Sequence, residues 1–181
     1  MRPAVAAPPV VVATPTTLAS FGRRFVATVI DNVLVAFLVV VALPLFVHDF
    51  QNRTTIGLKA FYAAVLAGNQ DAFTPDFDHL MTIILYTGMA LTLAYGAVCL
   101  GLWSRTLGQR MLSIAVSPLD KPADKVGWSR GVSRSLAWTL LSQGGSFFPL
   151  VNVFSISMIL WHPKRQSLPD LLARTQVVCR D

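Results

Sequence analysis

The chain has 181 residues, of which 54% are hydrophobic and only 13% charged, and its mean hydropathy is +0.57. This composition excludes an ordinary water-soluble domain and indicates an integral membrane protein with one compact membrane domain, surrounded by a lipid bilayer. The formal net charge of +6 comes mostly from Lys and Arg beside the apolar runs, which is typical of orientation signals and lipid-headgroup contacts, so we expect no nucleic-acid partner.

The composition of residues 1–20 predicts a flexible N-terminal tail. They are rich in Pro, Ala and Val and show no helical period. A cleaved signal peptide is not expected, because the long apolar run begins only after Arg23 and Arg24. We therefore assign residues 21–181 to the membrane domain.

The first apolar run, residues 25–47, is long enough to cross a bilayer as a helix, with Ser20 as a candidate N-cap. Asp31 lies inside this run. A carboxylate there costs roughly 2.5–3.5 kcal/mol on insertion scales, so it persists only with a partner or a function. Arg24 precedes Asp31 by almost two helical turns, which predicts both side chains on one face of the helix.

Residues 48–79 form a polar connection that contains a short amphipathic stretch, residues 57–68. We expect this stretch to lie along the membrane surface, since its apolar residues share one helical face. These are Leu58, Phe61, Tyr62, Val65 and Leu66. Oxygen and imidazole ligands that flank the connection could converge on a divalent ion. They are His48, Asp49, Asp76, Asp78 and His79. Polar residues are ordinary at membrane edges, however, so we expect no metal site.

The second apolar run, residues 80–103, is uncharged after His79 and ends at Trp103, a residue typical of membrane interfaces. Gly88, Thr92 and Gly96 recur at every fourth position. Such a stripe of small residues favours close helix packing over a substrate groove.

The third apolar segment, residues 128–161, is interrupted by Gly144, Gly145 and Pro149 and ends at Trp161. β-like runs stand on either side of it, at residues 111–116 and 175–180. Lys and Arg are concentrated before the first run, after the second and in the C-terminal tail, which predicts cytoplasmic termini.

Three plain spans would place the basic C-terminal tail outside. A broken or re-entrant hairpin in residues 128–161 would return the tail to the cytoplasm, although each arm of about 15 residues is short for a full crossing. The hairpin would also let the two β-like runs pair. The predicted fold is therefore an all-α integral membrane protein with three apolar segments, the third a hairpin, and a small cytoplasmic β-hairpin.

The chain resembles the RDD family, whose name stands for one Arg and two Asp. Arg24, Asp31 and Asp170 occupy the corresponding places, in GRRFVATVIDNV and KRQSLPDLLARTQVV, and residues 104–116, SRTLGQRMLSIAV, resemble the family's stretch after the second helix. Two differences are Pro169, where His is common, and Gln109 beside Arg110. The resemblance covers about residues 20–181 and implies a bacterial or archaeal membrane protein of a family suspected of transport.

The residues leave two interpretations of Asp31 open. It could be a protonatable or cation-binding carboxylate assisted by Thr28 and Asn32, or it could form a structural ion pair with a nearby arginine. The candidate arginines are Arg24, Arg110 and Arg134. Asp170 has the position of a helix-capping carboxylate, three residues after the N-cap candidate Ser167.

We expect a polar centre formed by Arg24, Asp31, Asp170, Thr28, Asn32, Arg110 and Arg134. The predicted function is transport or ion exchange in the plasma membrane, as a homo-oligomer or with a partner membrane protein. The alternative is a non-transporting accessory or assembly subunit that docks a partner or anionic lipid through its basic cytoplasmic face. No enzyme motif is present, no cofactor is expected, and Cys99 and Cys179 are not expected to pair.

Overall fold

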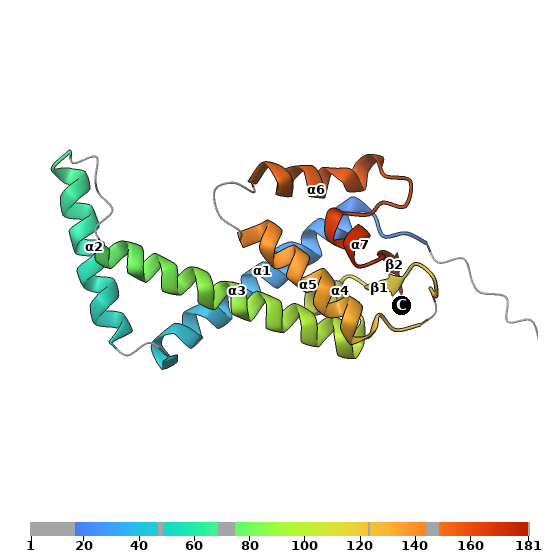
Figure 1. Cartoon of the computed structure of the whole chain (residues 1–181), viewed down its shortest axis with the longest axis horizontal. Coiled ribbons are helices and arrows are strands. Elements are labelled where there is room, and N and C mark those ends of the chain that lie inside the picture. The colour runs from blue at the N-terminus through green and yellow to red at the C-terminus, as the bar shows by residue number, and fades with distance from the viewer. Residues whose placement is uncertain (1–16, 47–48, 69–74, 123, 144–148, 181) are drawn as a thin grey trace, which may run out of the picture.

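The structure is a computed structural model that describes residues 17–46, 49–68, 75–122, 124–143 and 149–180. It is mostly helical, with one small sheet (Figure 1). The elements in chain order are α1 (Phe21–Phe46), α2 (Phe50–Leu66), α3 (Pro75–Trp103), α4 (Leu107–Met111), β1 (Ile114–Pro118), α5 (Gly127–Gln143), α6 (Pro149–Trp161), α7 (Leu168–Leu172) and β2 (Thr175–Cys179).

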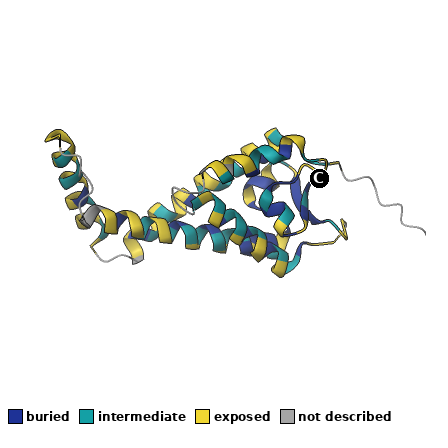
Figure 2. Cartoon of the chain, turned by 45° about the horizontal axis from the view of Figure 1, so that its top comes forward, coloured by how far each residue is buried: buried dark blue, intermediate teal, exposed yellow. Residues whose placement is uncertain are grey.

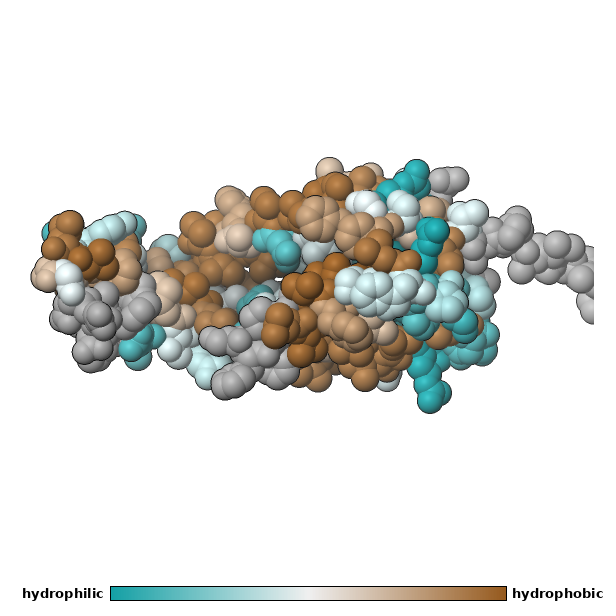
Figure 3. All heavy atoms as spheres, turned by 90° about the horizontal axis from the view of Figure 1, so that it is seen from above, coloured by the Kyte–Doolittle hydropathy of each residue, from teal (hydrophilic) through white to brown (hydrophobic). Residues whose placement is uncertain are grey.

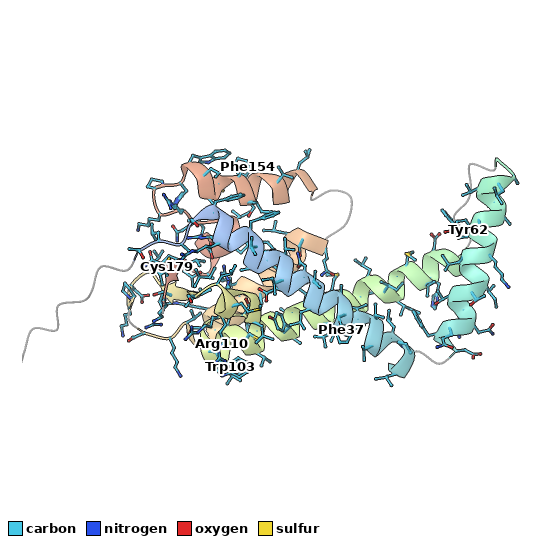
Figure 4. All side chains as sticks on the ribbon, turned by 180° about the vertical axis from the view of Figure 1, so that it is seen from behind. Phe37, Tyr62, Trp103, Arg110, Phe154 and Cys179 are labelled. Carbon is cyan, nitrogen blue, oxygen red and sulfur yellow. The ribbon has the colours of Figure 1, made fainter. Side chains whose placement is uncertain are left out.

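Within the described residues, two helices are long and apolar enough to cross a membrane, over Phe21–Leu45 and Asp78–Trp103. They correspond to the first two predicted runs. Few residues of their apolar windows are buried, 17% and 22%, and Phe37 on α1 is 62% exposed (Figure 4). Space-filling atoms show an apolar belt over the middle of the molecule, with hydrophilic residues gathered at the sheet end (Figure 3). Such a belt is the surface that a bilayer would cover.

Helix α1 begins at Phe21, four residues earlier than the apolar run suggested, so Arg24 lies in its first turns. The backbone N–H of Arg23 donates to Ser20 Oγ at 3.5 Å, and Ser20 therefore stands at the predicted N-cap. Pro44 lies inside the helix, near its end.

Helices α3 and α5 pack closely through small residues, as the stripe in α3 predicts. A Cβ added to Gly96 would lie 2.6 Å from Ser135 Oγ, and one added to Gly88 would lie 3.3 Å from Gln143 Oε1. Gln143 Nε2 also donates to Thr92 Oγ1 at 2.8 Å. The prediction of close packing is confirmed.

Helix α2 lies across the end of α3, away from the sheet (Figure 1). It is longer than the amphipathic stretch expected from the sequence, because it begins at Phe50. Its exposed apolar residues include Tyr62, labelled in Figure 4. Its position along a membrane surface stays a prediction.

The third apolar segment is two helices, α5 and α6. The chain reverses between them, and α6 runs back toward α7 and the sheet (Figure 1). The predicted turn at Gly144 and Gly145 lies outside the described residues. How deeply this pair enters a membrane stays a prediction.

The two β-like runs form one antiparallel sheet. Ile114 is opposite Cys179, and Pro118 is opposite Thr175. The predicted pairing is confirmed, but the prediction of a β-hairpin was wrong, because three helices separate β1 from β2 along the chain. The two strands have no short turn between them, and the folding back of α6 and α7 brings them together.

The end of the predicted tail belongs to the fold. Leu18 bridges to Val178, Ala19 N–H donates to Val177 O at 3.0 Å, and Cys179 N–H donates to Thr17 O at 2.8 Å. Ala19 is fully buried. The boundary at residue 20 was therefore set too late, because free backbone groups beside β2 bind the chain before α1 begins. The rest of the tail, residues 1–16, lies outside the described residues.

Burial is greatest at this sheet end of the molecule (Figure 2). The core cluster there joins the start of α1, the end of α3 and both strands. Its buried members are Ala19, Ala27, Leu100, Ile114, Val116, Val126 and Val177. This well-packed end holds the backbone around the candidate site.

Candidate functional site: two carboxylates beside two cavities

Asp170 is buried at the start of α7, with 1% of its surface exposed. Ser167 N–H and Ser167 Oγ both donate to Asp170 Oδ2, at 3.1 and 2.9 Å. The predicted capping arrangement is confirmed, with Pro169 in the first turn of the helix, where its missing N–H costs nothing.

Two arginines from different helices also contact Asp170. Arg134 Nε of α5 lies 2.7 Å from Asp170 Oδ1, and Arg24 NH1 of α1 lies 3.6 Å from Oδ2. Arg24 further donates to the carbonyls of Arg165 and Val177. One buried guanidinium thus ties α1 to the connection before α7 and to β2.

The electrostatics of Asp170 are set by opposing effects. Its burial favours the neutral acid, but the charges of Arg134 and Arg24, together with the Ser167 hydrogen bond, hold the pKa of Asp170 below its usual value. Asp170 is therefore ionised at neutral pH. It is the centre of a buried ion-pair triad, Arg24–Asp170–Arg134.

Asp31 has different partners. Tyr95 OH and Gly108 N–H donate to Asp31 Oδ1, at 2.6 and 2.8 Å, and Thr106 Oγ1 donates to Oδ2. No ion pair to Asp31 occurs among the described residues. Its hydrogen bonds come from neutral donors on α3, at the N-cap of α4 and on α4 itself.

The local sequence explains how α4 reaches Asp31. Thr106 and Gln109 form a capping box: Gln109 N–H donates to Thr106 Oγ1 at 3.3 Å, and Thr106 N–H donates to Gln109 Oε1 at 3.1 Å. Position 108 must be glycine, because a Cβ there would overlap Ala27 O and lie 3.0 Å from Asp31 Cγ. The glycine lets the backbone of α4 approach α1 closely enough to hydrogen-bond the carboxylate.

Two cavities adjoin these carboxylates. The smaller, about 90 Å³, is bordered by Asp31, Tyr95, Thr106 and Ser135. The larger, about 310 Å³, lies between α1, α5 and α6 and is bordered by the ion-pair triad. Residues common to both linings are Thr28, Asn32, Gln109, Arg134 and Trp138. The cavities therefore lie side by side, with Arg134 between them.

Comparison with known proteins gives one match. The family model of the RDD family matches residues 18–174. The chain belongs to the RDD family. Comparisons with curated proteins and with solved structures find no significant match. Together with the two helices that could span a bilayer, this family membership makes the chain an RDD membrane protein in a lipid environment.

The structure of this RDD protein divides the expected polar centre into two groups. Arg24 and Arg134 both contact Asp170, whereas Asp31 is hydrogen-bonded to Tyr95, Thr106 and Gly108. Thr28 and Asn32 line both cavities, and Thr28 Oγ1 also donates to Arg24 O at 2.9 Å. Thr28 and Asn32 therefore lie between the two groups.

Arg110 is the exception among the predicted site residues. Its side chain is exposed on α4 (Figure 4) and contacts neither carboxylate. The structure does not bring Arg110 to either carboxylate; it lies in the last turn of α4, after the capping box. Gly108, two residues earlier, is the residue of α4 that meets Asp31.

Sequence reasoning missed the donors to Asp31. The pattern Thr106-x-x-Gln109 is a capping-box signature, so the N-terminus of α4 could have been found. Tyr95 gave a weaker signal, as the one phenol near Gly96 on the packing face of α3. Within the described residues, no group of three His, Cys, Asp or Glu could hold a metal ion, and His48 lies outside them.

Proposed function

We propose that this RDD protein exchanges ions across the membrane and that Asp31 is the carboxylate that takes up a proton or a monovalent cation. The observation that carries the proposal is an ionisable side chain within a helix that could span a bilayer; it borders a cavity and has no cationic partner among the described residues. An intramembrane carboxylate of this kind is a functional candidate by default.

The lining of the smaller cavity supports cation binding. A carboxylate offers about four acceptor positions, and the three donors to Asp31 among the described residues leave one for a cation or a proton. Ser135 Oγ borders the same cavity and is buried without a hydrogen-bond partner among the described residues. Hydroxyl and carboxylate oxygens are suitable ligands for a hard cation.

The position of α4 provides a coupling step. Protonation of Asp31, or cation binding to it, weakens its acceptance of the Gly108 and Thr106 hydrogen bonds, because a neutralised carboxylate is a poorer acceptor. The N-terminus of α4 is then held less tightly to α1. Ion binding at Asp31 would in this way change the contact between a membrane helix and the segment that leads into β1.

The sheet supports an orientation for this protein. Residues 17–19 and β2 are hydrogen-bonded, so the chain before α1 and the chain after α7 lie on one side of the membrane. This favours a multi-pass arrangement in which α5 and α6 fold back over three plain spans. Exposed Lys and Arg near the sheet favour the cytoplasm for that side, in a plasma membrane. Reporters fused before Ser20 and after Asp181 should both report cytoplasm; reporters on opposite sides would exclude the fold-back.

The test of ion exchange is flux in reconstituted vesicles. A proton gradient is imposed across the vesicle membrane, and Na⁺ or K⁺ is added while internal pH is followed with a trapped dye. We expect cation-dependent proton movement by the native protein and its loss in Asp31→Asn. The matched control is Asp78→Asn, since Asp78 is exposed near the start of α3. Equal flux in Asp31→Asn and native protein would refute the role of Asp31.

The rival function is an accessory or assembly subunit. The observation in its favour is a set of exposed basic residues near the sheet end, where Figure 3 shows the hydrophilic surface. They include Arg23, Lys121, Lys125, Lys164, Arg165 and Arg174. Absence of flux from a folded native protein, together with a membrane protein that co-purifies only when these charges are intact, would favour this function and a hetero-oligomer.

A further inference from the structure

We propose that the larger cavity binds one acidic phospholipid, with its phosphate at Arg134 and part of an acyl chain between α1 and α6. This inference does not depend on ion exchange at Asp31, because the two carboxylates border different cavities.

The first argument is that guanidinium donors are left without acceptors. Arg134 uses Nε for Asp170, and its two terminal nitrogens have no hydrogen-bond partner among the described residues. Arg24 is 7% exposed, and its Nε is buried and has no hydrogen-bond partner among the described residues. Both side chains border the larger cavity. The buried Arg24 Nε without an acceptor is costly, and the terminal nitrogens of Arg134, whose side chain is 15% exposed, are available to donate, so an oxygen-rich ligand would be stabilised there.

The second argument is charge. Arg24 and Arg134 share one carboxylate, Asp170, so the triad carries one surplus positive charge. Asp31, the acid of α1, is hydrogen-bonded to neutral donors instead. A surplus charge away from water is unfavourable until it is paired. A phosphodiester carries one negative charge and presents several acceptor oxygens to a guanidinium.

The third argument is the apolar part of the cavity. Beyond the arginines it is bordered by Phe25 and Val29 of α1 and by Ile156 and Ile159 of α6. Phe25 and Val29 are exposed on the apolar belt. A cavity of about 310 Å³ that is lined by both charged and apolar side chains fits an amphiphile better than a small soluble anion.

The test is lipid binding to the full chain in mild detergent, measured by native mass spectrometry. Dioleoyl phosphatidylglycerol is compared with dioleoyl phosphatidylcholine and with inorganic phosphate. We expect phosphatidylglycerol to bind at least about tenfold more tightly than phosphatidylcholine, since hydrogen bonds to charged groups discriminate on this scale. Inorganic phosphate at equal concentration should not displace it.

Two variants locate the lipid. Ile156→Trp adds bulk to the cavity and should lower phosphatidylglycerol binding at least about tenfold. The control, Val153→Trp, places the same residue on the exposed face of α6, one turn away, and should bind as the native protein does. Arg134→Gln should remove the preference for the acidic headgroup. If that variant fails to fold, the two tryptophan variants still decide the location.

Each contrary result is informative. Equal binding of the two phospholipids would overturn the role of the arginines. Displacement by inorganic phosphate would identify a small-anion site in place of a lipid site. Equal loss in Ile156→Trp and Val153→Trp, or no loss in either, would place the lipid elsewhere on the protein.

Discussion

Asp31 and Asp170 are both acids of the motif for which the family is named, yet their surroundings differ in kind. Asp170 is fully buried, lies at a helix start and is held by two guanidinium groups. Asp31 is partly exposed, borders a cavity and accepts hydrogen bonds from two hydroxyls and one backbone amide. The arginines around Asp170 favour its charged form, whereas the partners of Asp31 among the described residues are all neutral donors. The contrast places an ion-pair network at Asp170 and a cavity beside a neutral hydrogen-bond network at Asp31, where ion exchange is proposed.

The largest expected effect is at Asp170. Asp170→Asn keeps the shape but leaves Arg24 and Arg134 without a counter-charge, and breaking a buried ion pair costs about 3–5 kcal/mol. We expect a large fall in thermal midpoint in detergent, partly restored by adding Arg134→Gln. The control is Asp120→Asn, because the Asp120–Arg130 pair is exposed and its loss should leave the thermal midpoint almost unchanged. A fall of equal size in Asp31→Asn would end the distinction between the two acids.

The stability of the protein in acid should also depend on Asp170. The folded-state pKa of Asp170 is lowered, so its stabilising contribution is fully present above the unfolded Asp pKa of about 3.9 and is lost as pH falls through the lower folded value. We expect the thermal midpoint of the native protein to drop on acidification below about pH 4. Asp170→Asn, which lacks this group, should show a flatter profile. Parallel profiles would mean that another group controls acid unfolding.

An intermediate effect is expected at the close approach beside Asp31. Gly108→Ala would place a Cβ against Ala27 O and push α4 from α1, and overpacking of this kind costs about 1–3 kcal/mol. Gly22→Ala is the control, since a Cβ there meets nothing within 4 Å. Thermal midpoints compare the two. Indifference to Gly108→Ala would show that α4 is not held by Asp31.

The smallest effect is expected at Tyr95. Tyr95→Phe removes a donor to Asp31 and the acceptor for Leu107 N–H, yet two donors to the carboxylate remain. We expect a loss of about 1.5 kcal/mol, at the low end for a hydrogen bond to a charged group. Tyr86→Phe on the exposed face of α3 is the control. If the proposal for Asp31 is right, Tyr95→Phe should also alter the pH at which flux is half-maximal.

Local patterns allowed part of this arrangement to be predicted. Ser167 and Asp170 are three residues apart, so their capping contact depends on one helical turn. The small residues of α3 and the two β-like runs likewise carry their signals in short stretches, and the positions of the first two apolar runs follow from length and hydropathy alone.

The partners of Asp31 could not be read in this way. Tyr95 and Thr106 are 64 and 75 residues away in sequence, and their contact depends on how α3 and α4 pack on α1. Arg24 and Asp31 do share a helical face, but seven residues of rise separate them by about 10 Å along the axis. Each therefore meets a different layer of the fold: Arg24 meets α7 and β2, and Asp31 meets α4.

The hydrogen bonds between residues 17–19 and β2 also constrain the order of assembly. β2 follows every helix in the chain, so the segment before α1 cannot be bound until α1 through α7 have left the ribosome. Arg24 acquires its carbonyl partner on Val177 at the same late moment. If α1 enters the bilayer as it is made, its arginine does so before this carbonyl partner exists, and the sheet closes only after β2 has been made. Contacts so distant in sequence form slowly, which leaves a lifetime in which a chaperone or protease could distinguish finished from unfinished molecules.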